Sequence, residues 1–194
     1  RLAKDKPGDA RVYVFIGSFY RAIGDLGGAE KYMDLAREYS PRKQSIIAQQ
    51  AIVAYSQGNL EKSRDLFAEA FELDERNDEA REFYAALLFL TGDADKAKAL
   101  VENESIMERF AANDFLLNAA VQSGDNNFVI EMYKMRVKKN PEIDQNWASL
   151  SFLYNQVGDK AGAVATLKEA AEKRPSFSKI ALCIAGNIEA GKAV

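Results

Sequence analysis

Cys183 is the only cysteine of the 194-residue sequence, and its side chain is the one best suited to covalent catalysis. A cysteine becomes a strong nucleophile when a neighbouring base or positive charge holds it as the thiolate, and the usual base is histidine. The sequence contains no histidine. We therefore expect Cys183 to act as a small buried hydrophobic residue on the apolar stripe of the last helix.

The remaining residue types do not form a catalytic, cofactor or metal pattern. A zinc site needs a set of cysteine and histidine ligands that this sequence lacks, and no loop has the oxygen-rich spacing of an EF-hand. The turn glycines occur as single Gly-Asp or Gly-Asn pairs rather than as the glycine runs that bind phosphate. We predict that the protein is not an enzyme and has no catalytic residue, no cofactor and no metal.

A regularly repeated pair of residues indicates where the helices of this chain begin and end. Glycine followed by Asp or Asn recurs at intervals of 34, 34, 32 and 34 residues, at Gly24-Asp25, Gly58-Asn59, Gly92-Asp93, Gly124-Asp125 and Gly158-Asp159. Glycine tolerates the left-handed backbone that ends a helix, and Asp or Asn caps the N-terminus of the next helix. Each pair therefore predicts a turn between two helices.

The clearest helical hairpin lies between Trp147 and Pro175. One stripe of its first helix carries mainly large residues, and one stripe of its second helix carries both large and small residues. These residues are Trp147, Leu150, Ser151 and Tyr154, followed by Ala163, Leu167 and Ala170. Their spacing around Gly158-Asp159 resembles the tetratricopeptide repeat (TPR), a helix-turn-helix unit of about 34 residues.

The resemblance implies an all-α fold, a right-handed TPR superhelix (α-solenoid) of five repeats with a C-terminal capping helix. We expect one array over residues 1–194, with eleven helices and no strand. The repeats are expected at residues 10–43, 44–77, 78–109, 110–143 and 144–177, and the capping helix at about 178–190. The third repeat has a weak pattern, which predicts a short or irregular second helix around residues 94–104.

Some residues depart from the family pattern or end the array. Gln50, Asn113 and Arg136 stand at positions where the resemblance predicts other residue types. The capping helix should cover the last repeat with apolar residues and expose its polar ones. Its apolar residues are Ile180, Leu182, Ile184 and Ile188, and its polar residues are Ser178, Lys179, Asn187 and Glu189.

In the TPR family the first helices of successive repeats line a concave groove that binds a segment of a partner protein. The corresponding positions here are Arg11, Arg21, Ile52, Tyr55, Phe89, Leu90, Asn118, Phe152, Asn155 and Gln156. Apolar anchors among amides suit a peptide that has apolar side chains and a free backbone. For Phe89 and Phe152 an equally good interpretation is that they fill the space between neighbouring helices.

The groove differs from that of chaperone-binding TPR proteins, which hold a carboxylate with Lys, Asn and Arg. Val14, Ser18, Glu79 and Phe83 occupy the corresponding positions here. We therefore predict a non-catalytic protein–protein interaction module that binds a peptide or helical segment of an unidentified partner. The alternative is a structural scaffold that forms homo-oligomers through the ends of the array.

Composition limits the other partners. The net charge of −3 and the absence of a basic stripe argue against nucleic-acid binding. Acidic residues outnumber basic ones in residues 44–109, which indicates either a solvated face or a patch for a basic partner. There is no apolar run of about 20 residues and no signal peptide at the start. We expect a soluble fragment without membrane insertion, in an unknown compartment, with the cytoplasm slightly favoured.

A second resemblance concerns the whole chain. The weak third repeat, the strong repeats at both ends and the final Pro175-Ser176-Phe177 and Ala190-Gly191-Lys192 segments resemble the C-terminal TPR arrays of bacterial O-antigen ligase/polymerase-like membrane proteins. This resemblance implies an accessory interaction domain, because the glycan chemistry of those proteins lies in a transmembrane portion. It is also an explanation for a sequence that does not begin with Met.

Overall fold

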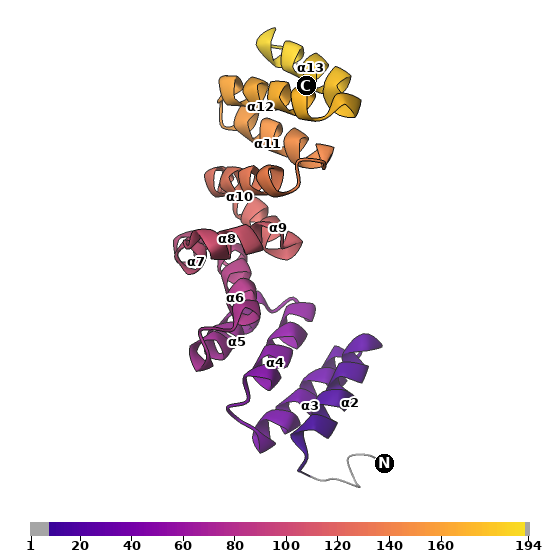
Figure 1. Ribbon diagram of the computed structural model, residues 1–194. Helices are drawn as coiled ribbons and strands as arrows, with labels where there is room; N and C mark the ends of the chain where they lie inside the picture. The colour runs from indigo at the N-terminus through magenta and orange to yellow at the C-terminus, as the bar shows by residue number, and fades with distance from the viewer. Residues whose placement is uncertain (1–7, 193–194) are drawn as a thin grey trace. The chain divides into compact units, whose positions relative to one another are not determined.

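The computed structural model describes residues 8–192, apart from the side chain of Glu104. These residues form twelve α-helices and no strand, which confirms the all-α repeat fold (Figure 1). The chain divides into two compact units, residues 1–100 and 101–194, and each unit is described by itself. Within residues 8–192, no helix combines the length and the apolar composition needed to cross a bilayer.

The first unit is a series of helical hairpins. In it α2 packs on α3 and α4 packs on α5, while contacts between α3 and α4 and between α5 and α6 connect successive hairpins. Its helices are α2 (Ala10–Ala22), α3 (Leu26–Tyr39), α4 (Gln44–Ser56), α5 (Leu60–Leu73), α6 (Asp78–Leu90) and α7 (Ala94–Val101), the last of which ends at the boundary of the unit.

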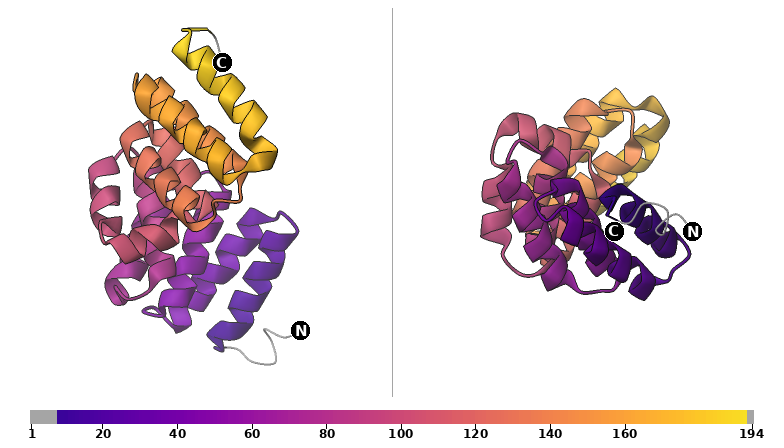
Figure 2. Two further views of the ribbon diagram at one scale, coloured as in Figure 1. Left: turned by 45° about the horizontal axis from the view of Figure 1, so that its top comes forward. Right: turned by 90° about the horizontal axis from the view of Figure 1, so that it is seen from below.

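The second unit continues with α8 to α13, and in it α10 packs on α11, α11 on α12 and α12 on α13 (Figures 1 and 2). The helix α8 packs on both α9 and α10. The bounds are α8 (Glu104–Ala111), α9 (Asp114–Ser123), α10 (Asn126–Lys139), α11 (Asp144–Gln156), α12 (Lys160–Lys173) and α13 (Pro175–Glu189).

The five predicted turns have the predicted geometry. The glycines have φ values from 77° to 90°, in the left-handed region, and they are Gly24, Gly58, Gly92, Gly124 and Gly158. The acidic or amide residue after each glycine caps the next helix. For example, the Asp159 carboxylate accepts a hydrogen bond of 2.8 Å from the backbone N–H of Gly162. This arrangement satisfies one of the free N–H groups at the start of α12.

The described residues contain one helix more than the eleven expected. The weak second helix of the third repeat is short, as predicted, because α7 has only 8 residues. Two residues later Asn103 caps the additional helix α8 by accepting a hydrogen bond of 3.0 Å from the N–H of Ser105. Asn113 then caps α9 by accepting from the N–H groups of Phe115 and Leu116, which explains its departure from the family pattern.

The other two departures are also explained by polar contacts between helices. Gln50 of α4 donates a hydrogen bond of 2.6 Å to Asp34 and accepts one of 3.0 Å from Arg37, both on α3. Arg136 of α10 donates to the backbone oxygen of Ala111 and, at 2.6 Å, to Asp114. At both positions hydrogen bonds to a neighbouring helix replace the usual apolar packing.

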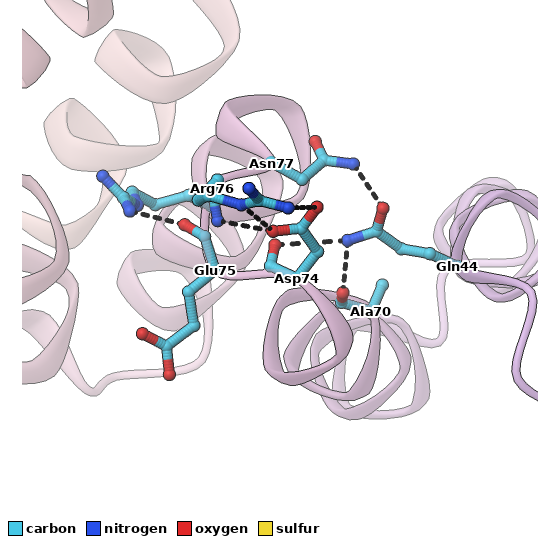
Figure 3. A network of polar contacts seen from close by, with 7 residues as sticks. Gln44, Ala70, Asp74, Glu75, Arg76 and Asn77 are labelled. Atoms are coloured by element: carbon cyan, nitrogen blue, oxygen red, sulfur yellow. Dashed lines mark hydrogen bonds and ion pairs between the residues drawn. The ribbon is translucent and has the colours of Figure 1, made fainter.

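A polar network also holds the connection between α5 and α6 (Figure 3). The side-chain nitrogen of Gln44 on α4 donates to the backbone oxygens of Ala70 at 2.6 Å and Asp74 at 3.3 Å. The oxygen of the same amide accepts a hydrogen bond of 2.7 Å from Asn77, which caps α6 through the N–H of Ala80. One side chain therefore satisfies carbonyl groups at the end of α5 and orients the cap of α6.

The hairpin of α11 and α12 has the predicted core. Trp147 is 1% exposed, and its indole N–H donates a hydrogen bond of 2.8 Å to the backbone oxygen of Pro141. Ala163 and Ala170 are fully buried, and Ser151 donates a hydrogen bond of 3.1 Å to the backbone oxygen of Ala163. This bond brings the two helix backbones close together, as the small residues predicted.

Replacing Ala170 with leucine is expected to lower the free energy of unfolding by about 1–3 kcal/mol, because no space remains at this buried position for a larger side chain. The measurement is urea unfolding followed by circular dichroism. The control is Ala165→Leu, at an exposed position of the same helix, which should change stability by less than about 0.5 kcal/mol. Equal stabilities for the two variants would contradict the close packing of α12.

The last helix differs from its expected orientation. Its buried side chains are Phe177, Ala181, Ala185 and Ile188, so only Ile188 of the four predicted apolar contacts is buried. Ile180 is 56% exposed and Leu182 is 50% exposed, while Ile184 is half-buried. Cys183 is exposed, and the prediction that it is buried was wrong. The physical reason is the short connection between the last two helices: Arg174 is both the residue that ends α12 and the residue that precedes α13. The chain therefore turns directly into α13, which packs on α12 through the stripe that begins at Phe177.

Candidate functional site

A cleft of about 570 Å³ lies in the second unit, lined by side chains from α9 to α13. Figure 1 shows these helices as the successive layers of the unit. Apolar side chains from four different helices reach the cleft, and they are Val121 of α9, Tyr133 of α10, Phe152 of α11 and Ile184 of α13. The cleft therefore depends on the packing of the whole unit rather than on a single hairpin.

Helix α11 supplies the largest share of the lining. Gln145, Ala148, Ser149, Phe152, Asn155 and Gln156 all reach the cleft. Their spacing of three or four residues places them on one face of the helix. The opposite face carries Trp147 and Leu150, which are buried. The same packing that buries the tryptophan therefore directs the other face of α11 into the cleft.

Phe152 is the most exposed apolar side chain of the cleft, at 58% of its surface. Val121, on helix α9, is 46% exposed. Large apolar side chains that gather in a hollow, rather than lying singly on a surface, are typical of interaction sites. Phe152 and Val121 are therefore available to a partner without any rearrangement of the core.

The polar groups of the cleft are neutral. No Asp, Glu, Lys or Arg lines it among the described residues. The side-chain amides of Asn126, Asn155 and Gln156 make no hydrogen bond within residues 8–192. Each amide can both donate and accept. The cleft can therefore bind neutral polar groups, such as a peptide backbone, around an apolar contact.

Charged residues close in sequence to the cleft are paired elsewhere. On α10, the ammonium group of Lys134 donates a hydrogen bond of 2.6 Å to Glu131, and this bond raises the pKa of the lysine. Neither side chain lines the cleft. In the described part of the chain, no group of three or more Cys, Asp or Glu side chains is placed to hold a metal ion.

The predicted groove residues of the second unit are only partly brought together. Phe152, Asn155 and Gln156 line the cleft, whereas Asn118 is exposed on α9 but does not line it. Asn126, Tyr133 and Ile184 line the cleft but were absent from the prediction. The prediction considered only the first helices of the five repeats, and these three residues lie on a second helix and on α13.

In the first unit, the predicted groove residues have different environments. Tyr55 is 41% exposed, while Ile52 and Leu90 are half-buried. Phe89 is only 2% exposed. Its burial favours the second of the two interpretations left open, in which it fills the interior, and we leave it out of the proposed binding surface.

The two predicted arginines also differ. Arg11 is exposed and forms an ion pair of 2.8 Å with Asp9, the cap of its own helix. Arg21 is half-buried, and its Nε atom has no hydrogen-bond partner within residues 8–192. Arg11 is therefore occupied by a local contact, whereas Arg21 retains an unsatisfied donor.

Comparison with known proteins supports the repeat fold. Residues 10–43 match a family model described as the tetratricopeptide repeat. No curated protein matches the sequence, so the resemblance to O-antigen ligase/polymerase-like proteins stays a prediction.

Several solved structures have the same fold. The structure of MamA protein has a TM-score of 0.69 and 18% identity, over 90% of this chain and 96% of that one. MamA from residue 41 to its end, from Desulfovibrio magneticus RS-1, gives a TM-score of 0.67 and 17% identity over 87% and 96% of the two chains. YrrB, described as a TPR protein with an unusual peptide-binding site, gives 0.60 and 16% identity over 94% of each chain.

Proposed function

We propose that this chain, which contains a tetratricopeptide repeat and has the fold of TPR proteins, is a non-catalytic protein-interaction module. Its second unit binds an extended segment of a partner protein in the cleft across α9 to α13. The observation that carries the proposal is the exposure of Phe152, a large apolar side chain in a cleft with no charged lining. Covering such a side chain is favourable by about 1.5–3 kcal/mol.

The amides of the cleft favour an extended segment over a helical one. In a helix the backbone N–H and C=O groups already bond to one another, so they have little capacity left for Asn126, Asn155 and Gln156. An extended segment presents free backbone groups, and each neutral hydrogen bond to them contributes about 0.5–1.5 kcal/mol. YrrB, which has the same fold, is described as having a peptide-binding site, and this supports a peptide as the ligand here.

The uncharged lining also defines the chemistry of the segment. A charged side chain that entered the cleft would lose hydration and find no opposite charge. The preferred segment therefore has an apolar side chain that contacts Phe152 and has no charge at the two neighbouring positions. This preference distinguishes the cleft from a site that holds a partner's terminal carboxylate.

The test is selection of peptides from a random display library by the purified chain, followed by calorimetry on the selected peptides. We expect uncharged sequences with an apolar residue, and Phe152→Asp should weaken their binding at least about thirtyfold, the scale of an interface hot spot. The control is Ile143→Asp, an exposed apolar position at the start of the same helix that does not line the cleft. Selected peptides that bind Phe152→Asp as well as they bind the wild type would contradict the proposal.

A further inference from the structure

Helix α11 divides the cleft of the second unit into two sides. It packs on α10 and on α12, while α9 packs on α10 and α13 packs on α12 (Figure 1). The lining that comes from α9 and α10 therefore lies on one side of α11, and the lining that comes from α12 and α13 lies on the other. The first group is Val121, Asn126 and Tyr133, and the second is Leu167, Ile184 and Ile188.

The side chains of α11 show where the division lies. Successive residues of an α-helix point about 100° apart around its axis, so Ser151 and Leu153 lie on opposite sides of Phe152. The hydroxyl of Ser151 donates a hydrogen bond of 3.1 Å to the backbone oxygen of Ala163 on α12. Leu153 therefore faces away from α12 and toward α10. Phe152 stands on the line between the two sides, where it is 58% exposed.

Each side of the cleft has its own apolar and amide groups. On α11, Asn155 lies about 60° from Phe152 on the side toward α12, whereas Gln156 lies about 40° from Phe152 on the side toward α10. We call the two sides the α10 half-site and the α12 half-site. The α10 half-site includes Val121, Asn126, Tyr133, Leu153 and Gln156, and the α12 half-site includes Asn155, Leu167, Ile184 and Ile188.

Both half-sites reach into the packed interior of the unit. Leu153 lines the α10 half-site although only 7% of its surface is exposed, and Leu167 lines the α12 half-site with 0% exposed. Lining residues that are themselves buried indicate hollows rather than a flat surface. Among the described residues, no charged side chain lines either hollow. Each half-site can therefore admit one apolar side chain of a partner.

The distance between the half-sites selects a backbone conformation for the partner. Two side chains that enter on opposite sides of one helix are separated by about the spacing of packed helices, about 8–10 Å. In a β-strand, residues on the same face are about 7 Å or about 13 Å apart, at steps of two and four residues. In a polyproline II helix, residues three apart lie on the same face at about 9 Å. Of these two extended conformations, only polyproline II matches the spacing.

The amides of the cleft suit the same conformation. A polyproline II segment has no internal hydrogen bonds, so its carbonyl groups are free. The side-chain NH₂ groups of Asn126, Asn155 and Gln156 can donate to these carbonyls. Proline lacks the backbone N–H but keeps the carbonyl, so it is compatible with these bonds. Phe152 lies between the half-sites, and aromatic side chains commonly contact polyproline II segments.

We propose that the partner segment binds in the polyproline II conformation, with two apolar side chains three residues apart, one in each half-site, and with the intervening backbone crossing Phe152. This inference rests on the proposed function and defines the partner more closely. The partner carries two apolar anchors, with two uncharged residues between them. Proline is favoured at the intervening positions, because it holds the segment in this conformation before binding and so lowers the entropy lost on binding.

The first test examines the sequences that the purified chain selects from a random peptide display library. They should share two apolar positions separated by two residues. A single apolar position, or two positions separated by one, three or six residues, would overturn this inference and leave the proposed function intact. Failure to select any peptide, or equal binding of the selected peptides to Phe152→Asp, would instead contradict the proposed function and this inference with it.

The second test measures the spacing by calorimetry, on versions of a selected peptide that have one, two or three prolines between the two anchors. The version with two prolines should bind tightest, and the other two should bind at least about tenfold more weakly, because one anchor then misses its half-site. A version with two alanines between the anchors should bind no more tightly than the one with two prolines. Equal affinities for the three spacings, or tighter binding of the alanine version, would overturn the inference.

The third test assigns each anchor to a half-site by double-mutant cycles. Val121→Ala alters the α10 half-site, and Ile184→Ala alters the α12 half-site. The cost of replacing one anchor by alanine should shrink about threefold or more in Val121→Ala only, and the cost of replacing the other should shrink similarly in Ile184→Ala only. Coupling of both variants to the same anchor, or of neither variant to any anchor, would overturn the two-anchor arrangement.

The matched controls are Val157→Ala and Leu182→Ala. Val157 is 42% exposed directly after α11, Leu182 is 50% exposed on α13, and neither lines the cleft. Both variants should bind the selected peptide like the wild type, and a loss equal to that of the half-site variants would contradict the assignment. Circular dichroism checks that each variant is folded, and Ile184→Val takes the place of Ile184→Ala if the latter loses helicity.

Discussion

Replacing Trp147 with alanine is expected to lower the free energy of unfolding of the second unit by about 3–5 kcal/mol, the usual cost of removing a large aromatic side chain from a core. Trp147 is 1% exposed between α11 and its neighbours, so its removal leaves a cavity that the surrounding helices cannot fill completely. The backbone oxygen of Pro141 also loses its hydrogen bond from the indole N–H. The measurement is urea unfolding followed by circular dichroism.

A matched control separates the effect of burial from that of residue type. Phe152→Ala removes a large aromatic side chain from the same helix, but at a position that is 58% exposed. This variant should lose less than about 1 kcal/mol. The effect of Trp147→Ala should be confined to α11 and the helices next to it, because a repeat contacts mainly its neighbours. An unchanged unfolding transition in Trp147→Ala would contradict the packing of this hairpin.

The parts of the fold that could be predicted are those where a residue type has one structural use. A glycine with an acid or amide after it ends one helix and caps the next, and the five turns have this geometry. Similarly, the large Trp147 on one helix and the small Ala163 and Ala170 on the next predict that the two helices pack closely against each other. Both signals are local, so they are present in the sequence even without knowledge of the neighbouring repeats.

The additional helix and the last helix could not be predicted in the same way. The interval of 32 residues between Gly92 and Gly124 shows that the repeat is altered, but it does not show that Asn103 starts a new helix there. On α13, the apolar residues Ile180 and Leu182 lie about 200° apart around the helix axis, so they cannot face the same neighbour. Which stripe is buried depends on how the chain enters the helix at Pro175.

The cleft shows a further limit of prediction from sequence. The predicted groove took residues from the first helices only, whereas Tyr133 and Ile184 come from other helices and reach the cleft through tertiary packing. The two aromatic residues left open, Phe89 and Phe152, are of the same type and both lie on first helices. Their exposures of 2% and 58% differ because they occupy different positions, three and six residues before the turn glycine.

This difference in exposure leads to opposite expectations for the same substitution. Phe89→Asp places a carboxylate at a buried position and also removes a large apolar side chain, so it should cost at least about 4 kcal/mol and reduce the helicity of the chain. Phe152→Asp places its carboxylate in water, and its stability should remain within about 1 kcal/mol of the wild type. Far-UV circular dichroism and urea unfolding of the two variants measure both effects before any partner is identified.

A third variant, Phe89→Leu, distinguishes the two costs at the buried position. Leucine keeps an apolar side chain there, so this variant should retain its helicity and lose far less stability than Phe89→Asp. A large loss of helicity in Phe152→Asp would show that this side chain supports the fold, and Phe152 could then not be the anchor of the cleft. Unchanged stability of Phe89→Asp would instead show that the interior around α6 admits water, and Phe89 would again become a candidate for partner binding.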